Sequence, residues 1–116
     1  MRIVIICSVR GASDEYRASL EQYVDSLEAA GHQVHLPHRD VDQQSRGIDI
    51  CRAHRSAMKE CDEVRLFYTD PTSQGTHFDM GMAFAFEKPI VVVENVPHGP
   101  EKSFGHMAEE WAEENS

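Results

Sequence analysis

The chain has 116 residues and a formal net charge of −9. That length predicts one domain over residues 1–116, and the charge excludes general binding to nucleic acid, which needs a basic surface. A small phosphorylated ligand held by a few local donors is compatible with it. No stretch reaches the ~20 apolar residues of a membrane span, and the first residues are too short an apolar run for a signal peptide. Three scattered cysteines, Cys7, Cys51 and Cys61, indicate reduced thiols in a cytoplasmic protein.

The first part of the chain predicts a strand, a helix and a second strand. Residues 3–7 form a continuous apolar run, which suits a strand covered on both faces. After the loop SVRGAS, apolar residues recur at helical spacing; they are Tyr16, Leu20, Tyr23, Val24 and Leu27. Ser13 or Asp14 is placed to cap this helix and Gly31 to end it. The stretch HQVHLP predicts a short strand that Pro37 stops.

The remaining elements continue this alternation. Residues 38–47 are polar and predict a loop, whereas the apolar spacing over 50–61 predicts a second helix. EVRLFYT predicts a third strand, residues 76–86 a third helix, and KPIVVVENV a fourth strand with Pro89 at its entrance. A last amphipathic helix is marked by Phe104, Met107, Ala108 and Trp111.

Alternating strands and helices predict an α/β fold with a parallel sheet between helices. With right-handed crossovers, the simplest arrangement is a flavodoxin-like, Rossmann-like three-layer sandwich of four to five strands in the order 2-1-3-4. Ligands of such sheets bind beyond the carboxyl ends of the strands, where the strand order reverses. That point lies between the first and third strands. The loops SVRGAS and DPTSQGT are therefore predicted to line a site.

Both loops carry residues suited to an anionic ligand. In the first, Ser8 and Gly11 permit close backbone approach and Arg10 supplies a positive charge beside the free amides of a helix start. In the second, Ser73 and Gly75 lie at or before the start of the third helix. An ordinary strand-to-helix turn in the first loop, and a turn with a Ser or Thr cap in the second, explain the same residues without a ligand.

Asp79 is expected in the first turn of the third helix, among apolar neighbours that solvate it poorly. The helix dipole explains an acid in that turn, whereas the apolar context favours a reactive carboxylate facing a ligand. His54 lies on the apolar face of the second helix, where a lone histidine is usually a hydrogen-bonded core residue. Because the other nearby histidines alternate between strand faces, no metal site is expected.

The sequence resembles the nucleoside 2-deoxyribosyltransferase superfamily, most closely its 2′-deoxynucleoside 5′-phosphate N-hydrolases. The resemblance rests on SVRG, on GIDICRAHRSAMKECDEV in the second helix and on SQGTHFDMGMAFAFEKPI, and it covers residues 3–96. It implies a flavodoxin-like homodimer that binds a nucleoside or nucleotide without a cofactor. It also implies that a carboxylate attacks the anomeric carbon of the sugar, the base leaves, and the sugar passes to water or to another base.

The resemblance assigns roles by position. Asp79 matches the catalytic nucleophile, which is usually Glu in the family, and His54 stands where the family carries an Asp that orients sugar or nucleophile. The implied substrate-binding residues are Ser8, Arg10, Gly11, Ser73 and Gly75, and also Ser103, which lies where the partner subunit completes the phosphate pocket.

Three interpretations stay open. The first is a nucleotide N-glycosidase or deoxyribosyltransferase-like enzyme acting on a (deoxy)nucleoside 5′-monophosphate. The second is a non-catalytic nucleotide-binding or sensor module, and the third is a partner domain without a ligand. In the last helix, the apolar stripe of Phe104, Met107 and Trp111 serves a homodimer or covers one face of the sheet.

Overall fold

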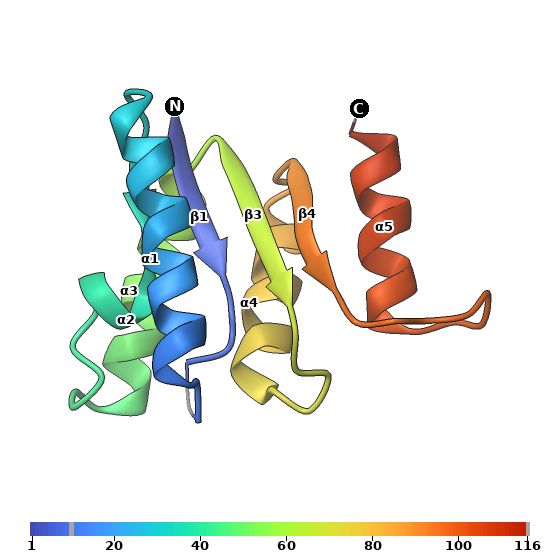
Figure 1. The fold of residues 1–116 in the computed structure, drawn as a ribbon, viewed down its shortest axis with the longest axis horizontal. Helices are drawn as coiled ribbons and strands as arrows, with labels where there is room; N and C mark the ends of the chain where they lie inside the picture. Colours follow the sequence, from blue (N-terminus) through green and yellow to red (C-terminus); the bar gives the residue numbers. More distant parts are fainter. Residues whose placement is uncertain (10, 116) are drawn as a thin grey trace.

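The computed structural model describes residues 1–9 and 11–115, and Figure 1 shows a parallel sheet flanked by helices. In chain order the elements are β1 (Arg2–Ile6), α1 (Asp14–Ala29), β2 (Gln33–His35), α2 (Pro37–Asp40), α3 (Gly47–Glu60), β3 (Glu63–Tyr68), α4 (Gln74–Ala85), β4 (Ile90–Asn95) and α5 (Phe104–Glu114). The predicted alternation is confirmed, with one added short helix, α2. Across these residues no helix is long and apolar enough to cross a membrane.

The strands pair in parallel in the order β2-β1-β3-β4. Ile3 of β1 pairs with Val34 of β2 on one side and with Glu63 of β3 on the other. The pairing of β3 with β4 shifts register between Leu66 and Phe67. The predicted α/β class and strand order are confirmed, and the described part of the chain contributes four strands.

Alternate side chains of β1 enter two cores, one on each face of the sheet, because successive strand residues point to opposite sides. Val4 and Ile6 lie in the core formed with α3, α4 and α5. Ile3, Ile5 and Cys7 lie in the core formed with α1 and β2. This double burial explains the continuous apolar run at the start of the sequence.

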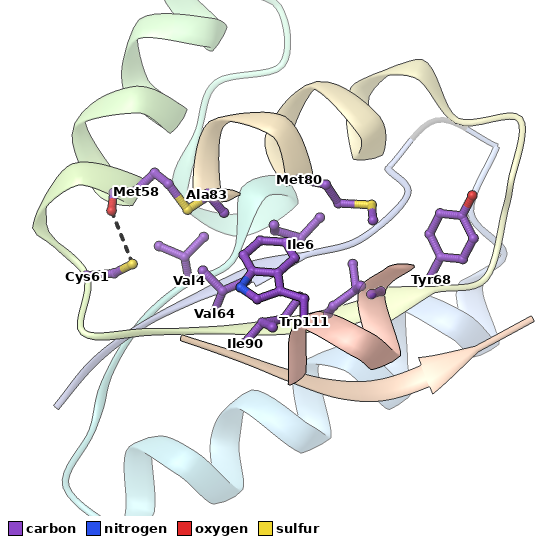
Figure 2. Close-up of a cluster of buried hydrophobic side chains, with 12 residues drawn as sticks. Val4, Ile6, Met58, Cys61, Val64, Tyr68, Met80, Ala83, Ile90 and Trp111 are labelled. Carbon is purple, nitrogen blue, oxygen red and sulfur yellow. Dashed lines mark hydrogen bonds between the residues drawn. The ribbon is translucent and has the colours of Figure 1, made fainter. Parts of the chain in front are cut away.

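Trp111 of α5 belongs to the first of these cores, which Figure 2 shows. Its side chain is 8% exposed, and its indole Nε1 donates a hydrogen bond to the Lys88 carbonyl at 3.1 Å. Of the two roles considered for the apolar stripe of the last helix, Trp111 therefore has the second: it covers one face of the sheet. Phe104, at the start of the same helix, stays 58% exposed.

The predicted loop over residues 38–47 is wrong at its beginning, where the chain forms α2. Pro37 occupies the first helical turn, where its missing amide costs nothing. The Asp40 carboxylate accepts a hydrogen bond from the Leu36 amide at 2.9 Å, and Arg39 binds Glu28 of α1 at 2.8 Å. Side-chain contacts with neighbouring elements, rather than apolar periodicity, hold this turn.

Candidate active site

The loops after β1 and β3 meet at the carboxyl edge of the sheet, as the strand order predicts. The Tyr16 hydroxyl of α1 accepts a hydrogen bond from Thr69 Oγ1, just after β3, at 3.2 Å. Burial is the largest influence on Tyr16 and raises its pKa, so the phenol stays neutral at physiological pH. Apolar spacing predicts Tyr16 only as part of a helix face, and its link between the two loops emerges only from the fold.

Ser73 caps α4. Its Oγ accepts hydrogen bonds from the Thr76 amide at 3.3 Å and from the Thr76 hydroxyl at 2.9 Å. Asp70 shapes the preceding turn by accepting from the Thr72 amide at 2.9 Å. The capped turn that explains this loop without a ligand is therefore observed. Because both bonds use the lone pairs of the Ser73 oxygen, its O–H group is still able to donate to an anion.

Asp79 lies in the second turn of α4 and not in the first. The prediction is wrong because Ser73 caps the helix, so that α4 begins at Gln74, before the expected start at Thr76. Asp79 is only 8% exposed. Since the effect of a helix dipole falls off within the first turn, the dipole does not account for this buried acid.

His54 of α3 faces Asp79. Its Nδ1 lies 3.3 Å from Asp79 Oδ2, and both side chains are 11% exposed. The ring of His35 in β2 meets the His54 ring edge to face, with centroids 5.7 Å apart. Burial first, and His54 second, lower the pKa of His35, which favours a neutral His35 behind the pair. The structure thus brings the two candidate catalytic residues together from separate helices.

Cys7 lies at the carboxyl end of β1, close enough to feel the charge of Asp79. Burial first, and Asp79 second, raise the pKa of the Cys7 thiol to about 12. A thiol held in this state is not a nucleophile near neutral pH. The reactive candidate at this edge of the sheet is therefore the carboxylate.

The predicted residues of the loop after β1 lie at the same edge. Ser8 follows β1 and is half-buried. Gly11 has a φ of 70°, in the left-handed region that favours glycine, and this turns the chain toward α1. Arg10 lies outside the described residues.

The start of α5 lies beside the start of α4 within one chain. Ser103 caps α5 by accepting a hydrogen bond from the His106 amide at 3.1 Å. The next residue, Phe104, has its ring centroid 4.9 Å from that of His77 in α4. Gly75 is exposed in the first turn of α4. The loop before Ser103 extends away from the sheet and returns to this edge (Figure 1).

Two open hollows lie elsewhere. One, of about 420 Å³, is lined at the amino end of the sheet by residues that include Arg2, Gln33 and Asp62. The other, of about 390 Å³, lies along β1, β2 and α3. We favour the carboxyl edge as the site because it combines the reversal of strand order, a buried acid and two hydroxyl-bearing loops. Among residues 1–9 and 11–115, no group of His, Cys, Asp and Glu is arranged to hold a metal ion.

This arrangement is that of an α/β protein whose strand order reverses between β1 and β3, the place where folds of this kind bind their ligands. Within that class, the chain belongs to the nucleoside 2-deoxyribosyltransferase family, whose model matches residues 5–111. No curated protein sequence matches it.

Several solved structures share the fold. The CMP N-glycosidase BcmB of Clostridium botulinum is 24% identical, with a TM-score of 0.63 over 79% of this chain and 70% of that one. The 2-deoxyribosyltransferase of Bacillus psychrosaccharolyticus is 16% identical, with a TM-score of 0.70 over 99% and 90%. A conserved protein of Enterococcus faecalis V583 is 16% identical, with a TM-score of 0.66 over 97% and 74%. At these identities the likeness establishes the fold alone.

Proposed function

We propose that this protein cleaves the N-glycosidic bond of a (deoxy)nucleoside 5′-monophosphate, with Asp79 as the reacting carboxylate. The observation that carries the proposal is the buried Asp79 in contact with His54, at the edge where the two loops meet. Membership of the nucleoside 2-deoxyribosyltransferase family supports it, as does the N-glycosidase activity of the structurally similar BcmB.

The chemistry follows from the carboxylate. One oxygen of Asp79 attacks C1′ as the C1′–N bond breaks, and the electron pair of that bond leaves with the base, which gains a proton from solvent. The negative charge of Asp79 stabilises the positive charge that develops on C1′. Water or a second base then attacks C1′ and releases the carboxylate. His54 holds the carboxylate in place through the contact at Oδ2, which leaves Oδ1 for the attack.

The phosphate would be held by neutral donors and one cation. The Ser73 hydroxyl and the amides at the start of α4, near Gly75, present donors to an anion. Ser8, Gly11 and Arg10 complete this proposed site from the loop after β1. Local donors of this kind reconcile a phosphate ligand with the net charge of −9.

We extend the proposal to a homodimer in the cytoplasm, in which Ser103 contributes to the phosphate pocket. The support for a dimer is α4, which exposes Phe78 and Phe84 by 55% and 60%. Burying these rings against a second copy would remove them from water. The three cysteines are free thiols, which fits a reducing compartment.

A base-release assay over the ribo- and deoxyribonucleoside 5′-monophosphates tests the activity. We expect free base from at least one nucleotide, detected by chromatography, and none with Asp79→Asn. One observation favours the alternative of a non-catalytic nucleotide-binding module: the contact of His54 Nδ1 already occupies one oxygen of the Asp79 carboxylate. Thermal stabilisation by nucleotides without base release would replace the enzyme with that module.

A further inference from the structure

His77 uses both ring nitrogens at the start of α4. Its Nδ1 lies 2.7 Å from the carbonyl oxygen of Ser73, and its Nε2 lies 2.7 Å from the hydroxyl of Tyr68. These are short distances for neutral hydrogen bonds. Neither the sequence motifs nor the proposed chemistry gives His77 a role.

The partners fix the direction of both bonds. A carbonyl oxygen only accepts, so Nδ1 carries a hydrogen and donates to Ser73. In the neutral ring, Nε2 is then the acceptor, and the Tyr68 hydroxyl donates to it. Protonation of the ring would reverse the second bond without removing it, because a phenol oxygen also accepts. The link between Tyr68 and Ser73 therefore persists in either charge state of His77.

The link joins a fixed point to a loop. Tyr68 is the last residue of β3, is 3% exposed and belongs to the core with α3, α4 and α5. Figure 2 shows its ring at the margin of this core with the hydroxyl directed away from the cluster. Ser73 lies at the other end of the loop and caps α4. His77 thus fastens the end of residues 69–73 back to the strand from which they start.

The His77 ring is also held on its sides. Tyr68 meets it edge on, with centroids 5.4 Å apart, and Phe104 covers it at 4.9 Å. The imidazole therefore has little freedom to turn away from its two partners. It sets where the Ser73 hydroxyl and the first amides of α4 lie relative to the sheet.

We propose that His77 is a positioning residue that, with Tyr68, holds Ser73 and the start of α4 where they bind the 5′-phosphate of the substrate. This inference rests on the proposed function, because it concerns the phosphate end of the same site. Misplaced donors would form weaker hydrogen bonds to the phosphate. The link should therefore matter for a nucleotide and not for the corresponding nucleoside.

The test compares the affinity for a nucleoside 5′-monophosphate with that for its nucleoside, by calorimetry, over the four ribonucleoside pairs. Tyr68→Phe removes one oxygen and keeps the buried ring. His77→Asn keeps a donor near the position of Nδ1 and loses the reach to Tyr68. The preference for the monophosphate is the ratio of these two affinities. We expect each variant to lower this ratio about tenfold, the effect of one lost hydrogen bond, while the nucleoside affinity stays unchanged.

Two controls separate positioning from general damage. Tyr23→Phe removes a hydroxyl that binds Arg65 on the other face of the sheet and should leave the preference intact. The double variant Tyr68→Phe, His77→Asn should lose no more than either single variant, because both break one link. Thermal melting shows whether a variant folds, and if His77→Asn fails to fold, Tyr68→Phe still decides.

Equal losses of nucleoside and nucleotide affinity, or an unchanged preference in Tyr68→Phe, would overturn the positioning role. A wild-type protein that binds nucleosides and their monophosphates equally would have a different meaning. It would remove the phosphate site from the proposed function, and this inference with it. The two failures are distinguishable because the second is seen before any substitution is made.

Discussion

Asp79 and His54 form a pair in which each residue determines what the other can do. The 3.3 Å contact between His54 Nδ1 and Asp79 Oδ2 is shielded from water on both sides. A carboxylate in such a place is held in one orientation, which favours attack at a fixed C1′. In the proposed reaction, activity would therefore depend on the pair and not on the acid alone.

The first prediction concerns this pair. Asp79→Asn removes both the charge and the nucleophile, so base release should fall about 10³-fold or more, while nucleotide affinity changes little because the phosphate is held elsewhere. Asp79→Glu should retain or raise activity by extending the reach of the carboxylate by one carbon–carbon bond, ~1.5 Å. The measurement is base release per enzyme together with calorimetric affinity for the same nucleotide.

A second variant set completes this test. The double variant Asp79→Glu, His54→Asp restores both residue types that the family resemblance expects at these positions. If Asp79→Asn turns over like the wild type, Asp79 is not the reacting group. If neither the wild type nor the double variant releases base from any nucleotide, the binding module replaces the enzyme.

The second prediction concerns the thiol next to this pair. With a pKa of about 12, Cys7 should resist alkylation by iodoacetamide at pH 8, whereas the half-buried Cys51 should be labelled first. Mass spectrometry of the digested protein identifies the labelled residue, and guanidinium should expose all three thiols. Labelling of Cys7 as fast as Cys51 in the folded protein would contradict its burial.

The raised pKa also makes stability depend on pH. Because the folded state holds the Cys7 proton more tightly than the unfolded state, this contribution is fully present below about pH 9 and is lost as the pH rises toward about 12. Urea unfolding measures the unfolding free energy at pH 8 and at pH 10.5. Between these two pH values it should fall less for Cys7→Ala than for the wild type.

At the scale of the elements, two helices begin with the same device. Ser73 caps α4 and Ser103 caps α5, each with its Oγ accepting a backbone amide three residues on. A capping serine contributes about 1 kcal/mol to stability. Since a cap and a phosphate ligand both use the first turn of the helix, a change at Ser73 confounds the two roles unless the cap is preserved.

The third prediction separates these roles. Asp is as good a cap as Ser, so Ser73→Asp should leave the melting temperature unchanged while its charge repels a phosphate and weakens nucleotide binding at least tenfold. Ser73→Ala should instead lower the unfolding free energy by about 1 kcal/mol. Unchanged nucleotide affinity in Ser73→Asp would place the phosphate elsewhere.

Ser103→Asp is the matched comparison, with the same cap chemistry on α5. A loss of nucleotide affinity there as well would support the proposed part of Ser103 in the phosphate pocket. No loss would assign Ser103 to capping alone. Calorimetry on the two Asp variants at one pH decides between these outcomes.

The sequence predicts the elements well where apolar patterning controls them. Both the continuous run of β1 and the spacing of Tyr16, Leu20 and Val24 lead directly to the observed strand and helix. It fails at α2, which depends on contacts of Arg39 and Asp40 rather than on periodicity. It also misplaces the start of α4, because the apolar spacing places the helix over residues 76–86 whereas the Ser73 cap starts it at Gln74.

The candidate site is only partly readable from the sequence, for a different reason. Topology alone locates the carboxyl edge, and the apolar context singles out Asp79. The contact of His54 with Asp79 joins two helices, and the bonds of His77 depend on where the ring turns. Such geometry has no signal in residue spacing, because several rotamers of each side chain fit the same pattern.

At the scale of the whole molecule, α4 is unusual because it carries large apolar side chains both in the core and on the surface. Asp79 is its one charged residue when His is neutral. Thr76, Met80 and Ala83 are buried, yet the Phe78 and Phe84 side chains stay exposed. Exposed aromatic side chains on a helix that already packs on the sheet indicate a surface that contacts another protein. We therefore expect another protein surface to cover α4, and a second copy of the chain satisfies this.

The fourth prediction follows from that face. Sedimentation at about 10 µM should show a dimer for the wild type and a monomer for Phe78→Glu. The glutamate would place an uncompensated charge at the centre of an apolar interface. Ile48→Glu is the control, since Ile48 is also 51% exposed but lies on α3. If Ser103 reaches the pocket of the partner, Phe78→Glu should also weaken nucleotide binding while the melting temperature stays that of a folded protein. A wild-type monomer that binds nucleotide tightly would refute the dimer, and a dimer that survives Phe78→Glu and Phe84→Glu would move the interface away from α4.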